Sequence, residues 1–152
     1  DGGREKEVCV VWGSMYGNTK KGLDEVLRGI EAEGVPYTLH RVPNEDPSFV
    51  LADAYKSEGI LIAMPTYEYR MFPPMAYVLS LLERKHVKGR TALRIGSWGW
   101  VGGAKKEYDE LIVPLKWNCL ESVEWAGGAG PETMSTLFES GRELARRVKA
   151  AQ

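Results

Sequence analysis

The chain has 152 residues, enough for one domain with a full hydrophobic core. Its formal net charge of −1 gives no electrostatic basis for binding nucleic acid or an anionic membrane. No apolar run approaches the roughly 20 residues of a membrane span. The two cysteines and two histidines have no metal-ligand spacing, so we expect no metal site, and the cytoplasm is the expected compartment.

The chain opens with a polar segment, residues 1–6, that resembles a linker. We therefore expect a single domain over residues 7–152, cut from a longer protein. No repeat, low-complexity tract or second domain is evident in the sequence.

Short apolar runs alternate with helical patterns along the whole chain. Apolar residues recur at positions i, i+3, i+4 and i+7 from Leu23 to Ile30, which predicts a helix with one buried face. The pair Asp46-Pro47 is typical of a helix start. The expected strands are residues 8–12, 37–42, 60–63, 91–95 and 118–125. The expected helices are residues 18–33, 47–57, 73–84, 104–115 and 131–149.

Strict alternation of buried strands and helices predicts an α/β three-layer sandwich, with a five-stranded parallel sheet and helices on both faces. In the order 2-1-3-4-5, Cys9 and Cys119 lie three strands apart, too far for a disulfide, so both are expected to be free thiols. Arg94 falls inside a buried strand and either pairs with a carboxylate or lies at the sheet end. Ligands of such sheets bind beyond the carboxyl ends of the strands, between strands 1 and 3.

Residues 13–19, Gly-Ser-Met-Tyr-Gly-Asn-Thr, connect the first strand to the first helix. The unpaired backbone N–H groups at a helix N-terminus form an anion site together with the helix dipole. Ser14, Asn18 and Thr19 add side-chain donors, and Gly17 allows close approach of the backbone. The loop has neither the P-loop nor the dinucleotide pattern. We expect it to hold a phosphate through neutral donors alone, since it contains no Lys or Arg; the alternative is an ordinary strand–helix turn.

Two further loops, residues 64–72 and 96–103, are expected at the same end of the sheet. They carry four large aromatic residues among Gly, Pro and Ser: Tyr67, Tyr69, Trp98 and Trp100. Apolar surface of this kind marks a binding site. A flat heteroaromatic ring between these loops, with its phosphate on the first loop, satisfies all three. The alternatives are a small hydrophobic cluster for the Trp pair and a partner surface for the Tyr pair.

These three loops resemble the FMN loops of a flavodoxin-like domain. More narrowly, they are similar to those of the C-terminal flavodoxin module of flavodiiron proteins (A-type flavoproteins). The most specific parts are the run Gly-Ser-Trp-Gly-Trp-Val-Gly-Gly at 96–103 and the Met-Phe-Pro-Pro helix start at 71–74. The resemblance covers residues 7–148 and implies FMN as the cofactor.

The resemblance also implies how the cofactor is held. Residues 14–19 would bind the phosphate, residues 65–69 would border the dimethylbenzene and N5 side of the ring, and residues 97–103 would cover its pyrimidine end, with Trp98 or Trp100 stacked on it. The implied cofactor-binding residues are Ser14, Met15, Tyr16, Gly17, Asn18, Thr19, Pro65, Thr66, Tyr67, Glu68, Tyr69, Ser97, Trp98, Gly99, Trp100, Gly102 and Gly103.

The chain departs from the family in three respects. Glu68 and Tyr69 stand where many members have Asn, the charge is nearly neutral rather than acidic, and the family's N-terminal di-iron domain has no counterpart here. The resemblance therefore implies an electron relay without catalytic residues of its own. It would pass electrons from a reductase, rubredoxin or reduced deazaflavin to a di-iron centre that reduces O2 or NO, and a homo-oligomer is compatible with this role. The alternatives are a free flavodoxin-like carrier and an FMN-dependent NAD(P)H:quinone reductase.

Several charged residues are expected to lie outside the site. His40 and His86 are expected at the surface, and the basic run from Arg84 to Arg90 on a solvated face at the opposite end of the sheet. Arg70 either points at the N1–C2=O edge of the flavin or pairs with Glu68 in solvent. A site without nearby cations would disfavour the anionic form of reduced flavin.

Overall fold

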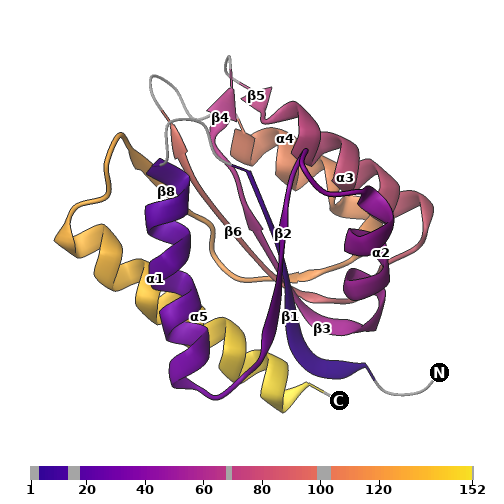
Figure 1. Ribbon diagram of the computed structural model, residues 1–152, viewed down its shortest axis with the longest axis horizontal. Helices are drawn as coiled ribbons and strands as arrows, with labels where there is room; N and C mark the ends of the chain where they lie inside the picture. Colours follow the sequence, from indigo (N-terminus) through magenta and orange to yellow (C-terminus); the bar gives the residue numbers. More distant parts are fainter. Residues whose placement is uncertain (1–3, 14–17, 68–69, 99–103, 152) are drawn as a thin grey trace.

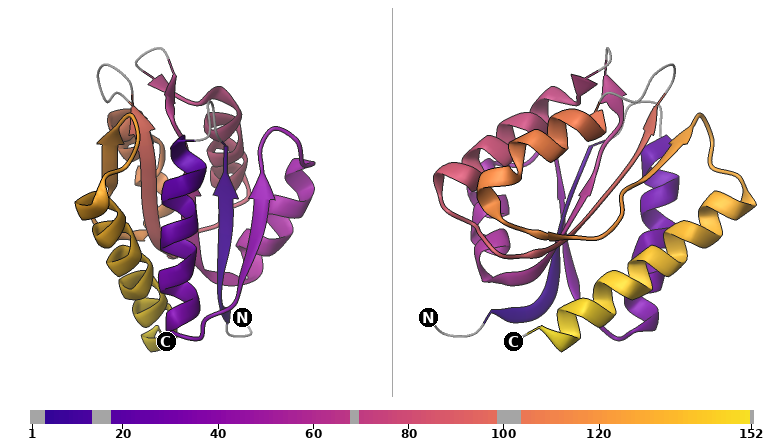
Figure 2. Two further views of the ribbon diagram at one scale, coloured as in Figure 1. Left: turned by 60° about the vertical axis from the view of Figure 1, so that its left-hand side comes forward. Right: turned by 180° about the vertical axis from the view of Figure 1, so that it is seen from behind.

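The computed structural model describes residues 4–13, 18–67, 70–98 and 104–151. A twisted sheet lies between two layers of helices, with α1 and α5 on one face and α2, α3 and α4 on the other (Figures 1 and 2). The strands are β1 (Glu5–Trp12), β2 (Tyr37–Arg41), β3 (Ser57–Ala63), β4 (Thr66–Tyr67), β5 (Arg70–Met71), β6 (Thr91–Trp98), β7 (Asn118–Cys119) and β8 (Val123–Ala126). The helices are α1 (Asn18–Ala32), α2 (Pro47–Lys56), α3 (Pro73–Arg84), α4 (Ala104–Leu111) and α5 (Pro131–Ala150).

The main sheet has the order β2-β1-β3-β6-β7, with β8 also paired to β6, and all of these pairings are parallel. This confirms the predicted 2-1-3-4-5 order, with β7 and β8 sharing the fifth position. Trp12 pairs with Ala63, and Ala63 with Ile95, so β1, β3 and β6 end at one edge. The segments that follow these strands therefore leave the sheet side by side.

The prediction of one continuous fifth strand over residues 118–125 is wrong, because the structure has two short strands there. Cys119 pairs with Ala92 and Val123 with Ile95, so the edge carries one residue more than β6 between these pairs. An extra residue of this kind is a bulge, which interrupts the ladder. The fifth strand is therefore divided into β7 and β8.

The expected helix 104–115 is too long. Helix α4 ends at Leu111 and a 3-10 turn, Val113–Leu115, follows it. Pro114 lacks the N–H that a continuing helix needs and restricts Val113. Among the described residues, no helix combines the length and apolar character needed to cross a lipid bilayer.

Each face of the sheet has its own hydrophobic core. On β1, Cys9 and Val11 pack toward α2, α3 and α4, whereas Val8 and Val10 pack toward α1 and α5. The alternation follows from the period of two along a strand. Both faces of the central strands are thus buried, as their apolar sequence predicts.

Cys9 and Cys119 are both free thiols, as predicted, but their surroundings differ. Burial, with a smaller contribution from the Asp53 carboxylate, raises the pKa of the Cys9 thiol to about 12. Burial also raises the pKa of the Cys119 thiol, but Cys119 is an exposed residue that a reagent can reach. At pH 8 we therefore expect a thiol reagent to modify Cys119 alone in the folded protein, and both cysteines in concentrated urea. Rapid modification of Cys9 without denaturant, followed by mass spectrometry, would contradict this burial.

His40 does not lie at the surface, contrary to expectation, whereas His86 does. The His40 side chain is buried, with Nδ1 2.7 Å from Glu45 and Nε2 2.6 Å from Asp53. These contacts tie β2 to the turn before α2, through Glu45, and to α2 itself, through Asp53.

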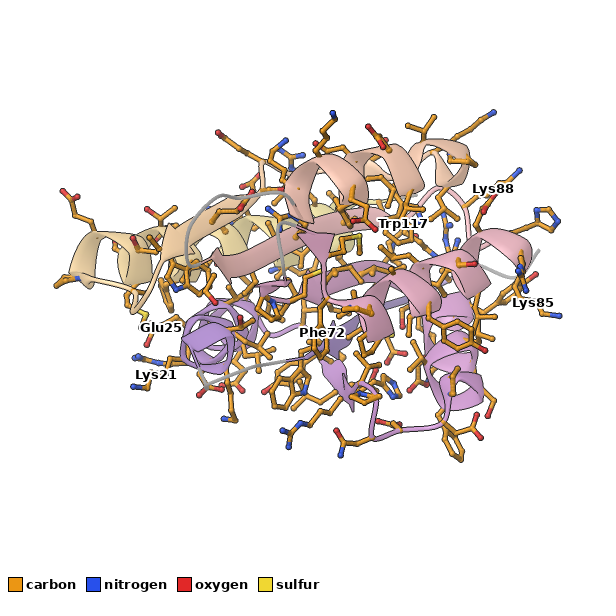
Figure 3. The ribbon with its side chains drawn as sticks, turned by 90° about the horizontal axis from the view of Figure 1, so that it is seen from above. Lys21, Glu25, Phe72, Lys85, Lys88 and Trp117 are labelled. Atoms are coloured by element: carbon orange, nitrogen blue, oxygen red, sulfur yellow. The ribbon has the colours of Figure 1, made fainter. Side chains whose placement is uncertain are left out.

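The basic run at the opposite end of the sheet is only partly solvated. Arg84, Lys85 and Lys88 are exposed, and Figure 3 shows Lys85 and Lys88 pointing outward. Arg90 is buried and donates to the backbone carbonyls of Ala54, Tyr55 and Lys88. The prediction of a solvated face is wrong for Arg90. Its guanidinium donates to backbone carbonyl groups in the last turn of α2 and in the turn before β6.

The first residues of the described chain are attached to this same end. Strand β1 begins at Glu5, Arg4 Nε lies 2.8 Å from the Glu58 carboxylate, and Lys6 donates to the Ala151 carbonyl. Glu58 is buried, so this ion pair is shielded from solvent.

Candidate functional site

The candidate site lies where β1, β3 and β6 end. Gly13 follows β1 and donates its N–H to the Ala63 carbonyl, at 2.9 Å. The Met64 N–H, after β3, donates to the Ile95 carbonyl of β6, at 3.1 Å. The parallel hydrogen-bond pattern of the sheet therefore continues to the residues at which the three loops begin.

The first loop is described only at its ends. Ser14, Met15, Tyr16 and Gly17 lie outside the described residues, and α1 begins at Asn18. The N-terminus of α1 is therefore at the carboxyl edge of the sheet, as the anion-site hypothesis requires.

A buried hydrogen bond joins the first loop to the third. Thr19 Oγ1 lies 3.0 Å from Ser97 Oγ, and both residues are buried. Thr19 is in the first turn of α1 and Ser97 is the penultimate residue of β6. The structure thus brings together two predicted site residues that are 78 positions apart in the chain.

The second and third loops approach each other at Gly96. A Cβ atom at Gly96 would lie 2.0 Å from the Met64 carbonyl oxygen, closer than any side chain permits. Pro65, the first predicted contact of the second loop, is buried directly after Met64. Glycine at position 96 is therefore what allows the two loops to start from adjacent backbone.

The second loop contains a short hairpin that was expected to be loop. Strands β4 and β5 are antiparallel, with Thr66 paired to Met71 and Tyr67 to Arg70. The Met71 N–H donates to the Glu107 carboxylate of α4, at 3.1 Å. Glu68 and Tyr69 lie outside the described residues. Pairing with β5 fixes the backbone of Thr66 and Tyr67, both predicted site residues. The bond from Met71 to Glu107 in turn fixes β5 against α4.

Phe72 follows the hairpin and lies near the middle of the molecule when it is viewed from above (Figure 3). It is half-buried and packs against the core on the α2, α3 and α4 side, and its carbonyl accepts from the N–H groups of Met75 and Ala76 in α3. The Met-Phe-Pro-Pro segment thus closes the loop onto a helix start, with both prolines in the first turn.

The third loop is shorter than expected, because β6 continues through Ser97 to Trp98. Strand β8 explains this extension, since Trp125 pairs with Ser97 and Ala126 with Trp98. Gly99, Trp100, Gly102 and Gly103 lie outside the described residues, and α4 begins at Ala104.

A cation lies at the same edge of the sheet, on a strand that the sequence argument left out. Arg41, the last residue of β2, pairs with Trp12 of β1, and its guanidinium carbon is 5.1 Å from the centre of the Trp12 indole. Trp12 is the residue before Gly13 and the first loop. Stacking on an indole holds an exposed guanidinium in place. The prediction that neutral donors alone hold the phosphate considered only residues 13–19; the parallel pairing of β1 and β2 was the signal that could have found Arg41.

A second cation lies beneath the third loop. Arg94 is 1% exposed, its Nη2 lies 2.6 Å from the Glu124 carboxylate of β8, and its Nε lies 3.4 Å from Ser122 Oγ. Its guanidinium carbon lies 5.8 Å from the centre of the Tyr108 ring. Of the two alternatives given for Arg94, pairing with a carboxylate is confirmed. Burial lowers the Arg94 pKa, and the Glu124 carboxylate opposes that change.

No protein-family model matches the chain. Among curated proteins, it is 26% identical over 146 residues to the anaerobic nitric oxide reductase flavorubredoxin of Aeromonas hydrophila. It is 28% identical over 150 residues to the coenzyme F420H2 oxidase of Methanothermobacter marburgensis. These alignments cover 95% of this chain but only 30% and 37% of the two relatives. The chain thus spans about a third of the length of these relatives.

Solved structures share the fold over nearly the whole chain. The flavodiiron protein from Giardia intestinalis superposes with a TM-score of 0.91 at 26% identity, covering 97% of this chain and 37% of that one. An archaeal flavodoxin superposes with a TM-score of 0.83 at 22% identity, covering 94% of this chain and 99% of that one. The flavodoxin-like fold inferred from the three loops is therefore confirmed.

Proposed function

This chain is a homologue of the flavodiiron proteins with a flavodoxin-like fold, and we propose that it is an FMN-binding electron-transfer domain. The observation that carries this proposal is the buried contact between Thr19 and Ser97, which joins the proposed phosphate loop to the proposed ring loop. Bound FMN supplies one- and two-electron chemistry, and the protein supplies position and charge.

The described residues are compatible with FMN. Helix α1 directs its free N–H groups to the carboxyl edge of the sheet, and the hydroxyls and amide of residues 14–19 have the donor chemistry for a phosphate. Arg41 adds positive charge over Trp12, two residues before that segment. At Gly96 a Cβ would collide with the Met64 carbonyl, so the two proposed ring loops start from backbone that is in contact.

Each segment has a separate proposed role. Residues 14–19 bind the phosphate, residues 65–69 border the dimethylbenzene and N5 side of the ring, and residues 97–103 cover its pyrimidine end. Trp98 or Trp100 stacks on the ring and excludes water from it. The buried Thr19–Ser97 bond fixes the distance between the phosphate and ring segments.

The partner of this domain is a separate redox centre. By its homology, we propose that the domain receives electrons from a reductase or rubredoxin, or from a reduced deazaflavin, and passes them to a di-iron domain that reduces O2 or NO. The flavorubredoxin and nitric oxide reductase relatives, of which this chain matches about a third, support this assignment. Two free cysteines suit a cytoplasmic location.

Titration of the purified chain with FMN tests the cofactor. We expect one FMN per chain and weaker binding of riboflavin, because riboflavin lacks the phosphate that α1 and Arg41 attract. Thr19→Val removes the bond to Ser97 and is expected to weaken FMN binding roughly tenfold. Thr136→Val is the matched control, since Thr136 is exposed on α5 and bonds only within its helix.

A colourless protein that binds no FMN would overturn the proposal. Equal affinity for FMN and riboflavin would instead contradict the phosphate role of the first loop.

The archaeal flavodoxin, which this chain covers almost completely, favours a free-standing carrier as the second candidate function. Electron transfer from the reduced chain to an added di-iron domain, faster than to a soluble haem protein, distinguishes the relay from a general carrier.

A further inference from the structure

We propose that Arg94 and Glu124 form a compensated charge pair in the floor of the proposed flavin crevice, and that each charge shifts the relative affinity for reduced and oxidised FMN in the direction opposite to the other. This inference rests on the proposed FMN site. The sequence argument gave a role at the ring to Arg70 alone among the cations and to neither member of this pair.

Arg94 reaches the point where the second and third loops begin. The Arg94 Nη1 atom lies 3.4 Å from the position that a Cβ at Gly96 would take, and the Met64 carbonyl oxygen lies 2.0 Å from that same position. Met64 opens the second loop, and Gly96 is followed by the two last residues of β6. The guanidinium therefore lies directly under the junction of the two proposed ring loops.

Strand geometry places the Arg94 side chain on the α4 side of the sheet. Residues alternate along β6, so Arg94 shares a face with Ala92 and Gly96, whereas Leu93 and Ile95 face α1 and α5. Tyr108 of α4 covers the guanidinium, which leaves Arg94 almost fully buried. Water therefore screens this charge little.

Glu124 is the counter-charge and comes from the strand next to β6. It pairs in register with Gly96, and its carboxylate lies 2.6 Å from Arg94 Nη2. The Glu124 side chain is 18% exposed, against 1% for Arg94. The bulge between β7 and β8 brings Ser122 within 3.4 Å of Arg94 Nε as well. The Asp109 carboxylate and the Tyr108 phenol, both from α4, also act on Arg94.

The charge of this pair bears on the flavin because reduction adds charge to the ring. Two electrons from an external reductant and one proton from solvent convert the neutral oxidised ring into a reduced ring with one negative charge at neutral pH. A buried cation nearby stabilises that negative charge and a buried anion destabilises it. With both partners present, the two effects largely cancel.

Removing one partner at a time makes the effect measurable. Glu124→Gln keeps the side-chain shape and leaves the Arg94 charge uncompensated. We expect it to raise the ratio of the FMN dissociation constants, oxidised over reduced, about fivefold. Arg94→Met leaves the Glu124 charge uncompensated and is expected to lower the same ratio about fivefold. The double variant Arg94→Met/Glu124→Gln is expected to return to within about twofold of the parent.

The ratio is obtained from the midpoint potential of the protein–FMN complex, measured with dithionite, against that of free FMN, because the two couples close a thermodynamic cycle. Glu58→Gln is the control: Glu58 is a buried carboxylate paired with Arg4 at the opposite end of the sheet. It should leave the ratio unchanged. Because the two single variants have opposite expected signs, either folded variant tests the inference.

Each outcome has a definite meaning. If the parent protein binds no FMN, the proposed function fails. If it binds FMN and neither single variant changes the ratio, or Glu58→Gln changes it equally, this inference fails while the proposed function stands.

Discussion

Replacing Gly141 with alanine is expected to lower the free energy of unfolding by about 3 kcal/mol. Gly141 lies on α5, where α5 crosses α1, and a Cβ atom there would be 2.1 Å from the Val26 carbonyl oxygen and 2.9 Å from the Val26 carbonyl carbon. Backbone atoms cannot rotate away as a flexible side chain can. The two helices must separate, which loosens the core formed by residues such as Leu144 and Val148.

Urea unfolding followed by circular dichroism measures this loss. The midpoint should fall with little change in slope, which identifies a change in stability rather than in the surface exposed. Gly128→Ala is the matched control, because a Cβ at Gly128 meets nothing within 4 Å and its φ is not in the left-handed region. Equal stability of Gly141→Ala and Gly128→Ala would show that α1 and α5 are not held as closely as described.

Replacing Gly96 with alanine is expected to weaken FMN binding about 30-fold and to lower the free energy of unfolding by about 2 kcal/mol. The added Cβ would lie 2.0 Å from the Met64 carbonyl oxygen, so the end of β6 and the start of the second loop must move apart. That movement displaces both proposed ring segments relative to each other. It also disturbs Arg94, whose Nη1 lies 3.4 Å from the same position.

The two effects are measured separately, by FMN titration and by urea unfolding of the FMN-free protein. Gly128→Ala again serves as the control for a glycine-to-alanine change at an open position. Comparison with Gly141→Ala separates the site from general stability, because Gly141 lies in the middle of α5 and a Cβ there meets the Val26 backbone of α1. Unchanged FMN affinity in a folded Gly96→Ala protein would contradict the placement of the crevice.

The sequence predicted the sheet order and placed the starts of the three loops at one edge of the sheet, because both follow from local pattern. Apolar runs such as 60–63 mark buried strands, and the carboxyl ends of parallel strands share one edge, so three loops far apart in the chain could be grouped. The pairing of Thr19 with Ser97 follows the same logic. The roles assigned to the predicted cofactor-binding residues in all three loops remain predictions.

What the sequence did not reveal depends on contacts between distant elements. Arg41 was overlooked because it is far from the first loop in sequence, although β2 places it against Trp12. The Glu124 partner of Arg94 depends on a bulge that shifts β8 by one residue, which no local pattern signals. In the sequence, His40 has the pattern of a polar residue on a half-exposed strand. Its burial depends on contacts with Glu45 and Asp53, which no local pattern indicates.

The interrupted edge of the sheet has a consequence beyond the site. An incoming strand from another molecule would find two residues of β7, a break, and then four residues of β8, with no continuous row of free backbone groups. Short or bulged edges of this kind resist edge-to-edge association. The same irregularity that admits Ser122 and Glu124 to a buried arginine therefore also protects this border of the protein from aggregation.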